Sequence, residues 1–207
     1  MSARPKLYDR AYFDRWYRRD RQGVGQRAFV RRKVRLALGI AEYLMQREVR
    51  SVLDVGAGEG AWRAHLLAER PRLRYTGVDA SAYAIRRYGL TRNLHQARFG
   101  ELAGLELRGP FDLVVCSDVL HYVPERELTA GLAAMGRWAG AVAWIEFFVS
   151  GDEFEGDRRE LALRSARFYE LRLARAGFTH CGLHAYATSP LADGLVTFER
   201  GREMSSR

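Results

Sequence analysis

Cysteine is scarce in this sequence of 207 residues, and no spacing of cysteine and histidine suggests a zinc site. Only Cys116 and Cys181 occur. Two cysteines are too few for the disulfide scaffold of a small secreted protein, and a reducing compartment suits them better. We therefore expect a cytoplasmic protein with no metal centre.

Long hydrophobic runs are also missing. The longest apolar stretch covers about residues 138–149 and includes Glu146, so it falls well short of the roughly 20 residues that a membrane helix needs. The first 21 residues are charged throughout, unlike a signal peptide. These features predict a protein without a membrane partner.

Lysine is nearly absent, although the chain is basic. Of 34 basic residues only Lys6 and Lys33 are lysines, and 25 acidic residues leave a net charge of +9. Such a balance allows a phosphate-rich partner. No motif interleaves aromatic and basic residues, however, so solvated arginines are favoured over a nucleic-acid surface. With 47% hydrophobic and 29% charged residues, the composition is that of an ordinary globular protein.

The first 48 residues predict an N-terminal helical cap. Aromatic side chains alternate with charges at helical spacing, and they are Tyr8, Tyr12, Phe13, Trp16 and Tyr17. Gly23 and Gly25 then interrupt the pattern, and a second amphipathic helix is expected over 26–46. Two interpretations stay open for the aromatic stripe: a lid that closes over a bound ligand, with Tyr12 in contact with it, or plain helix packing.

From Arg50 onward, short β-rich runs alternate with helical stretches. The runs cover 51–55, 73–79, 94–99, 111–117, 141–148, 180–187 and 195–200. This alternation predicts a doubly wound α/β fold with a mainly parallel, seven-stranded, Rossmann-like sheet. Only residues 188–194 separate the last two runs, too few for a crossover helix, so we expect an antiparallel C-terminal hairpin. The whole chain, 1–207, reads as one domain with its core at 49–200.

A glycine-rich turn, VLDVGAGEG, is the strongest local motif. Gly56, Gly58 and Gly60 follow the first predicted strand and precede a helix expected over 61–70, so that a ligand can approach the backbone. The third glycine comes two residues after the second, whereas the dinucleotide fingerprint requires three. Asp54 precedes the turn, where its carboxylate could orient an ammonium group of the ligand.

Asp79 ends the second predicted strand, 23 residues after Gly56. A carboxylate there can accept hydrogen bonds from both hydroxyls of a ribose. The alternative is that Asp79 caps the following helix, a role for which Ser81 competes.

Together with Gly100–Glu101 and the run FDLVVCSDVLHYV, these motifs resemble the class I S-adenosylmethionine-dependent methyltransferases over about residues 49–200. The resemblance implies S-adenosylmethionine as cofactor and S-adenosylhomocysteine as product. It also implies that Asp54 orients the methionyl amine and that Asp79 binds the ribose. After the third strand the family usually has Asp, where this chain has Glu101. The candidate cofactor contacts are Tyr12, Asp54, Gly56, Ala57, Gly58, Gly60, Asp79, Ala80, Gly100, Glu101, Leu102, Ser117 and Asp118.

Methyl transfer from a sulfonium is an in-line displacement, so the enzyme mainly positions the acceptor and removes its proton where there is one. His121, just after the fourth strand, is the first candidate base because its ordinary pKa suits neutral pH. The alternative is a histidine that hydrogen-bonds the cofactor or packs in its loop. Glu146, inside an apolar strand, is the second candidate, and a satisfied buried pair is its alternative.

Only the absence of known sequence motifs limits the class of methyl acceptor. The Asp/Asn-Pro-Pro-aromatic run of exocyclic-amine methyltransferases is replaced by 116–119, Cys-Ser-Asp-Val, and no Pro-Cys motif is present. The polar segment 151–160 is either a substrate entrance or a solvated loop. A small-molecule acceptor, methylated on oxygen or nitrogen, is the default. The alternatives are an RNA or other anionic acceptor, an NAD(P)-dependent oxidoreductase, or a cofactor-binding protein without turnover. The oligomeric state is not predicted.

Overall fold

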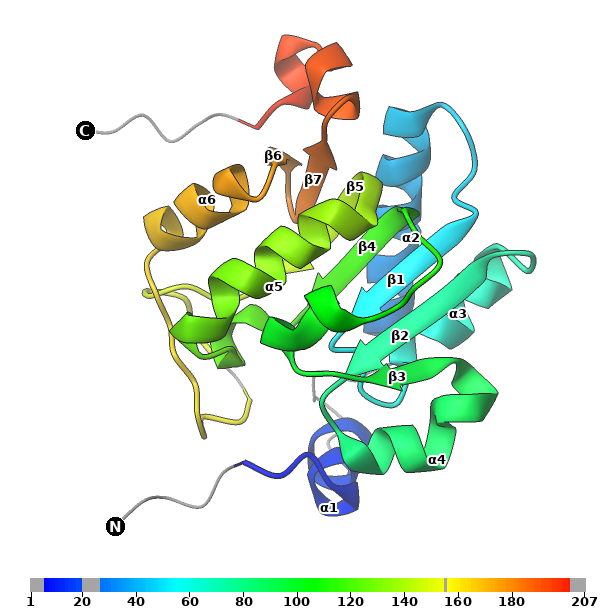
Figure 1. The fold of residues 1–207 in the computed structure, drawn as a ribbon, viewed down its shortest axis with the longest axis vertical. Helices are drawn as coiled ribbons and strands as arrows, with labels where there is room; N and C mark the ends of the chain where they lie inside the picture. Colours follow the sequence, from blue (N-terminus) through cyan, green and yellow to red (C-terminus); the bar gives the residue numbers. More distant parts are fainter. Residues whose placement is uncertain (1–5, 20–26, 155, 202–207) are drawn as a thin grey trace.

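A seven-stranded sheet forms the centre of the computed structural model, which describes residues 6–19, 27–154 and 156–201 (Figure 1). The strands lie in the order β3-β2-β1-β4-β5-β7-β6. The first five run parallel, and β7 is antiparallel to both β5 and β6. Their bounds are β1 (Ser51–Val55), β2 (Arg74–Asp79), β3 (Leu94–Gln96), β4 (Phe111–Ser117), β5 (Ala139–Glu146), β6 (Phe178–Gly182) and β7 (Ala185–Thr188). The doubly wound, mainly parallel fold predicted from the sequence is confirmed.

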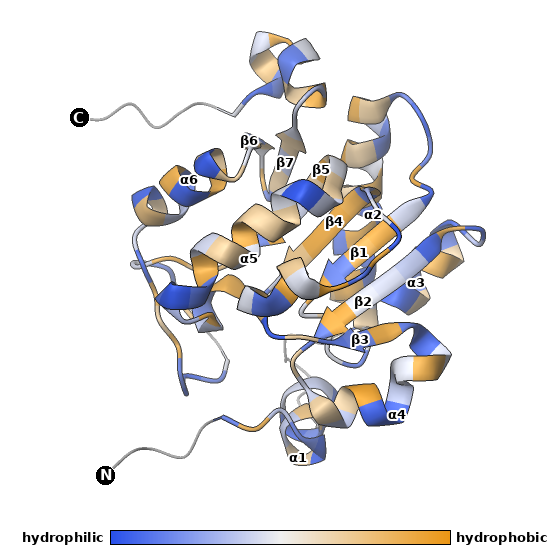
Figure 2. Ribbon diagram, in the orientation of Figure 1, coloured by the Kyte–Doolittle hydropathy of each residue, from blue (hydrophilic) through white to orange (hydrophobic). Residues whose placement is uncertain are grey.

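Helices cover both faces of the sheet and bury two separate apolar clusters. One cluster lies under α2 (Arg27–Met45) and α3 (Ala61–Glu69), with side chains of α4 (Ala82–Arg92) against it. The other lies under α5 (Glu125–Trp138) and α6 (Ala166–Arg175). Figure 2 shows β1 and β4 as apolar, as expected of central strands buried on both faces.

The C-terminal hairpin is present, but the predicted strand bounds were wrong. Residues 180–187 are not one strand, because the chain turns between β6 and β7 at Leu183–His184, next to Gly182 with its φ of +100°. Residues 195–200 hold the short 3-10 turn η5 (Thr197–Glu199) rather than a strand. Phe198 is fully exposed there, so the apolar run reflects no buried strand.

Other differences are smaller and concern where elements end. The third strand stops at Gln96, and the 3-10 turn η2 (Phe99–Gly104) follows it. The first predicted helix consists of a short α1 (Arg10–Phe13), capped by the Asp9 carboxylate, and a π-helical continuation η1 (Asp14–Arg19). The second helix, α2, is confirmed within the described residues, while Gly23 and Gly25 lie outside them.

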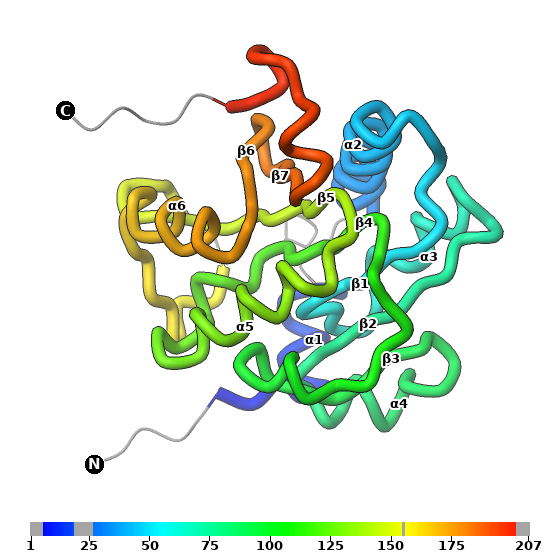
Figure 3. The backbone as a smooth tube through the Cα atoms, turned by 45° about the horizontal axis from the view of Figure 1, so that its top comes forward, coloured from blue at the N-terminus to red at the C-terminus, as the bar shows by residue number. Residues whose placement is uncertain are grey.

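The N-terminal segment, defined as residues 6–19, lies far from the hairpin. Figures 1 and 3 both place α1 beside α4, at the edge of the sheet where β1 and β2 end. This is the carboxyl edge, where crevices of parallel α/β sheets form. The fold thus brings the aromatic N-terminal residues to the glycine-rich turn.

Helix α5 packs closely enough on η2 that a glycine is required at the contact. A Cβ at Gly131 would overlap the Phe99 ring and come within 2.6 Å of the Phe99 carbonyl oxygen. We expect Gly131→Ala to lower the free energy of unfolding by about 1–3 kcal/mol, the usual cost of overpacking.

Gly39→Ala in α2 is the matched control, because a Cβ there meets nothing within 4 Å. It should raise the free energy of unfolding by about 0.5–1 kcal/mol through helix propensity. Urea denaturation of both variants measures the difference, and equal effects of the two substitutions would contradict the packing argument.

Candidate active site

The glycine-rich turn follows β1 in a conformation that only glycine adopts easily. Gly56, Gly58 and Gly60 have φ of +77°, +55° and +82°. A Cβ at Gly56 would overlap the Val119 side chain, and one at Gly58 would lie 3.1 Å from a ring atom of Phe13. The turn therefore needs glycine both for its backbone angles and for its close neighbours.

Asp79 ties the glycine-rich turn to the start of α4. Its Oδ2 accepts a hydrogen bond from Gly58 N at 2.7 Å, and its Oδ1 accepts one from Ser81 N at 2.7 Å. Burial raises the pKa of Asp79, and these two hydrogen bonds oppose the rise. The side chain of Ser81, not that of Asp79, caps α4 by accepting from Ala84 N. A carboxylate has about four lone-pair positions, so Asp79 keeps acceptor capacity for a diol.

Asp54 lies near the end of β1, just before the turn. Its side chain is only 2% exposed, and its Oδ2 accepts a hydrogen bond from the Tyr75 hydroxyl at 2.7 Å. Burial raises the pKa of Asp54 to about 7, although the Tyr75 hydrogen bond opposes the rise. Asp54 is thus a buried carboxyl group bound to Tyr75, and its contact with a methionyl amine stays a prediction.

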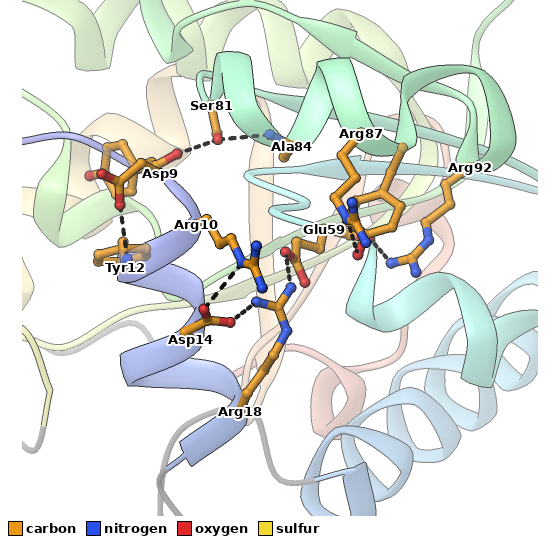
Figure 4. Close-up of polar contacts among 12 residues, drawn as sticks. Asp9, Arg10, Tyr12, Asp14, Arg18, Glu59, Ser81, Ala84, Arg87 and Arg92 are labelled. Carbon is orange, nitrogen blue, oxygen red and sulfur yellow. Dashed lines mark hydrogen bonds and ion pairs between the residues drawn. The ribbon is translucent and has the colours of Figure 1, made fainter.

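The N-terminal segment is held against the turn and α4 by several contacts (Figure 4). The Ser81 hydroxyl donates to the Tyr8 carbonyl oxygen, and Arg18 pairs with Asp14 and with Glu59 of the turn. The Phe13 ring stacks on Tyr83 at 5.8 Å between centroids. Phe13 thereby covers Gly58, a contact that helical spacing alone could not reveal.

A small pocket of about 30 Å³ lies under the N-terminal segment, beyond the ends of β4 and β5. Aromatic rings form most of its wall. Its lining residues are Tyr12, Trp16, Tyr17, Asp118, His121, Tyr122, Phe148, Phe154, Gly156 and Asp157. From the sequence, the segment 151–160 is either a substrate entrance or a solvated loop. In the structure, its residues Phe154, Gly156 and Asp157 line the pocket.

His121 is buried in this pocket wall, with 1% of its surface exposed. Burial, together with the nearby Lys6 charge, lowers the pKa of His121 to about 4. Its Nδ1 accepts a hydrogen bond from Phe148 N at 3.3 Å, which leaves the proton on Nε2. The imidazole is thus neutral at pH 7 and arranged to donate from Nε2. Its predicted role as a base is not tested by these contacts, but they favour a donor.

Glu146 is the centre of a polar cluster that also contains Ser117, Asp118 and Lys33. The Lys33 ammonium lies 2.7 Å from Glu146 Oε1 and 3.6 Å from Asp118 Oδ2, and Ser117 Oγ donates to Glu146 Oε2 at 2.6 Å. Burial raises the pKa of Asp118, while the Lys33 charge opposes the rise. Glu146 therefore has the contacts of a satisfied buried pair, yet its neighbour Asp118 lines the pocket. A catalytic role for Glu146 stays a prediction.

Sequence reasoning missed Lys33 as a site residue. It lies on the buried stripe of α2, three residues after Val30 and next to Val34. A lysine on the apolar face of a helix is rare unless it is paired. The position of Lys33 on an apolar helix face, in a chain with two lysines, was the signal by which the sequence could have indicated a paired lysine at the site.

The residues expected near an adenine lie in and around η2. The Glu101 carboxylate accepts a hydrogen bond from Arg98 N at 2.9 Å, and Leu102 is buried in the core. A Cβ at Gly100 would lie 2.9 Å from a side-chain carbon of Glu127. Ala57 is buried and Ala80 is exposed beside the turn. None of these five residues lines the pocket, and their contacts with a cofactor stay predictions.

The described ranges lack two kinds of feature. No three His, Cys, Asp or Glu side chains of residues 6–19, 27–154 and 156–201 gather as ligands for a metal ion. Over the same ranges, no helix combines the length and hydrophobicity that crossing a lipid bilayer requires.

Comparison with known proteins agrees with this geometry. Residues 53–141 match the family model of a methyltransferase domain. A comparison with curated protein sequences gives no match.

Solved structures share the fold at low sequence identity. A S-adenosylmethionine-dependent methyltransferase from Archaeoglobus fulgidus is 19% identical with a TM-score of 0.60, and the match covers 81% of this chain and 73% of that one. The sugar N-methyltransferase KedS8 from Streptoalloteichus is 21% identical with a TM-score of 0.58, covering 91% and 94% of the two chains. The O-methyltransferase NcsB1 from neocarzinostatin biosynthesis is 23% identical with a TM-score of 0.52. That match covers 78% of this chain but only 55% of NcsB1.

The matched domain, the sheet order and the glycine-rich turn agree with the resemblance to class I S-adenosylmethionine-dependent methyltransferases that the sequence predicts. The methyltransferase domain and the fold implied by that resemblance are supported by these matches, and the Archaeoglobus fulgidus neighbour uses the predicted cofactor, S-adenosylmethionine.

Proposed function

We propose that this enzyme methylates an oxygen or nitrogen atom of a small molecule. The observation that carries the proposal is the mostly aromatic lining of the pocket under the N-terminal segment, which includes Tyr12, Trp16 and Tyr17; at about 30 Å³ it admits an acceptor only when that segment moves outward. Apolar pockets with a few polar groups are typical of small-molecule sites. An RNA acceptor would call for an open basic surface instead.

The glycine-rich turn and Asp79 fit the cofactor. S-adenosylmethionine supplies a methyl group already activated by a positive sulfur, so little covalent chemistry is left to the protein. We assign Asp79 to the two ribose hydroxyls, through the acceptor capacity left beside its bonds to Gly58 N and Ser81 N. Gly58 has no side chain of its own, so a ligand can approach the backbone of the turn once the Phe13 ring moves off Gly58.

We further assign the N-terminal cap, residues 1–48, as a lid over the core at 49–200. Its support is the contact of Phe13 with Gly58 and the ion pair of Arg18 with Glu59, which join the N-terminal segment to the turn. A lid that closes over reactants excludes water from them.

For the molecule to be methylated, the pocket offers one hydrogen-bond donor and one group that can take a proton. His121, held neutral, can donate from Nε2 to an acceptor oxygen or nitrogen and so orient it. Asp118, whose pKa is raised by burial, is the pocket carboxylate suited to take a proton from that atom. Lys33 holds both Asp118 and Glu146 in place.

The printed names of two neighbours support a small acceptor. KedS8 is a sugar N-methyltransferase, and NcsB1 was crystallised with S-adenosylhomocysteine and 1,4-dihydroxy-2-naphthoic acid. Both are small-molecule enzymes of the same fold.

Calorimetric titration with S-adenosylmethionine, S-adenosylhomocysteine and NADPH tests the cofactor first. We expect micromolar binding of the first two and none of NADPH. Release of S-adenosylhomocysteine is then measured with a panel of small alcohols, phenols and amines, and with RNA. Turnover with a small acceptor supports the proposal. Binding of NADPH, binding without turnover on any acceptor, or turnover only with RNA would each contradict it in favour of a different function.

A further inference from the structure

The ammonium of Lys6 lies inside a cage of three tyrosine rings. Its Nζ is 5.1 Å from the ring centroid of Tyr8, 5.2 Å from that of Tyr12 and 3.7 Å from that of Tyr122. Asp157 Oδ2 completes the cage at 3.0 Å from Nζ. The Lys6 side chain is 2% exposed. Several aromatic faces around one cation are the arrangement by which proteins recognise organic ammonium groups.

This cage is unlike the other cation contacts of the described residues. Every other described Lys or Arg side chain that lies over an aromatic ring faces one ring alone. The Lys6 side chain, whose Nζ also donates to the Arg159 carbonyl oxygen at 3.4 Å, is one of several links that fix this part of the chain. The Lys6 backbone N donates to Glu160 Oε1 at 2.7 Å, and the Tyr8 carbonyl accepts from Ser81. The cage is therefore more elaborate than a simple anchor for the chain requires.

The cage is also continuous with the pocket. Tyr12, Tyr122 and Asp157 belong both to the cage and to the pocket lining. The Tyr122 hydroxyl donates to the Asp157 carbonyl oxygen at 2.8 Å, which fixes this part of the wall. An ammonium in the cage therefore lies at the wall of the pocket assigned to the acceptor, where His121 and Asp118 also lie.

We propose that Tyr8, Tyr12, Tyr122 and Asp157 form a binding site for an organic ammonium group of the acceptor, which Lys6 occupies until the acceptor displaces it. This inference rests on the proposed function, because it places that acceptor in the pocket. An alkylammonium is weakly enough hydrated for aromatic faces to replace part of its water, and the Asp157 carboxylate neutralises its charge. Lys6 is then an internal competitor that lowers the apparent affinity for any external ammonium.

The test uses n-butylammonium, which has the length and charge of a lysine side chain, and the full chain with Lys6→Met. Methionine fills similar space without charge. If Lys6 occupies the cage in about nine molecules of ten, its removal should tighten butylammonium binding about tenfold. Tyr122→Leu in the Lys6→Met background should abolish that binding. Neutral 1-butanol should not bind in either background.

Arg10→Met is the matched control, because Arg10 is an exposed cation of the same segment that lies outside the cage. It should bind butylammonium as the unmodified protein does. Equal affinities of the unmodified protein and the Lys6→Met variant would overturn the inference, as would retained binding after Tyr122→Leu. Binding of butanol as tight as that of butylammonium would do so too, because the site would then be merely apolar.

Titration with S-adenosylhomocysteine separates this inference from the proposed function. If the thioether binds the unmodified protein and the Lys6→Met variant alike while butylammonium binds neither, the cage proposal fails and the proposed function stands. If the thioether fails to bind either protein, the proposed function fails, and the butylammonium titration alone decides whether the cage is an ammonium site.

Discussion

Replacing Asp79 by alanine should weaken the binding of S-adenosylhomocysteine about 100-fold. In the assigned role its carboxylate accepts from two ribose hydroxyls, and hydrogen bonds to a charged group contribute about 1.5–3 kcal/mol each. The loss of about 3 kcal/mol corresponds to the stated change in affinity. The substitution also releases Gly58 N and Ser81 N, so the turn itself loses two acceptors. Calorimetry at constant pH and salt measures the effect.

Ser81→Ala is the matched control for that experiment. It removes the cap of α4 and the hydroxyl contact with Tyr8, but it keeps the Asp79 carboxylate. It should cost about 1 kcal/mol of stability, as cap removal does, and leave the affinity for the thioether nearly unchanged. An Asp79→Ala protein that binds the thioether as well as the unmodified protein would remove Asp79 from the ribose site.

Replacing Asp54 by asparagine should stabilise the free protein at alkaline pH. Its pKa is raised from 3.8 to about 7 because the carboxylate is buried. A buried acid with a raised pKa does not lower the free energy of unfolding at a pH below its ordinary pKa. The loss of stability grows as the pH rises from the ordinary pKa to the folded pKa and is constant above it. At 1.36 kcal/mol per pH unit, the cost at pH 8 is up to about 4 kcal/mol. Asparagine removes the charge and keeps an acceptor for the Tyr75 hydroxyl.

The stabilisation by Asp54→Asn should therefore grow by about 2–3 kcal/mol between pH 5 and pH 8. Urea denaturation at the two pH values measures it. If Asp54 also orients the methionyl amine, the same variant binds S-adenosylhomocysteine more weakly, so stability and affinity change in opposite directions.

Asp112→Asn provides a control of opposite sign. Burial alone would raise the pKa of Asp112, but Arg47 and the backbone N–H groups of Arg50 and Ser51 lower it. A lowered acid pKa stabilises the fold at every pH above the ordinary value. Asp112→Asn should thus destabilise the protein equally at pH 5 and pH 8. A pH-independent effect of Asp54→Asn would show that its carboxylate is not held uncharged by burial.

Much of the fold was predictable because periodicity and turn chemistry are local. The strand at 51–55 and the strand at 111–117 have the predicted bounds, because both are short apolar runs bordered by polar residues. The hairpin bounds failed at Gly182, where one glycine with positive φ divides an apolar run that looks continuous. The apolar residues at 195–200 looked like a strand although Phe198 faces solvent.

The site was predictable only where one short motif carries it. The glycine-rich turn and the strand-end Asp79 come from such motifs. Lys33, Lys6 and Phe13 reach the site through tertiary contacts with residues far away in the sequence, such as Glu146 and Asp157. No local pattern encodes those pairings. The burial that lowers the pKa of His121 is likewise a property of the packed pocket, not of the sequence around it.

Both lysines of the chain are buried, Lys33 against Glu146 and Lys6 in its cage. The remaining basic side chains are arginines, whose guanidinium groups keep their protons throughout the physiological range and are poor nucleophiles by comparison with an amine. Neighbouring copies of the enzyme thus offer one another no exposed lysine amine. An enzyme whose pocket recognises alkylammonium groups therefore does not methylate the lysine side chains of neighbouring enzyme molecules, even at high protein concentration.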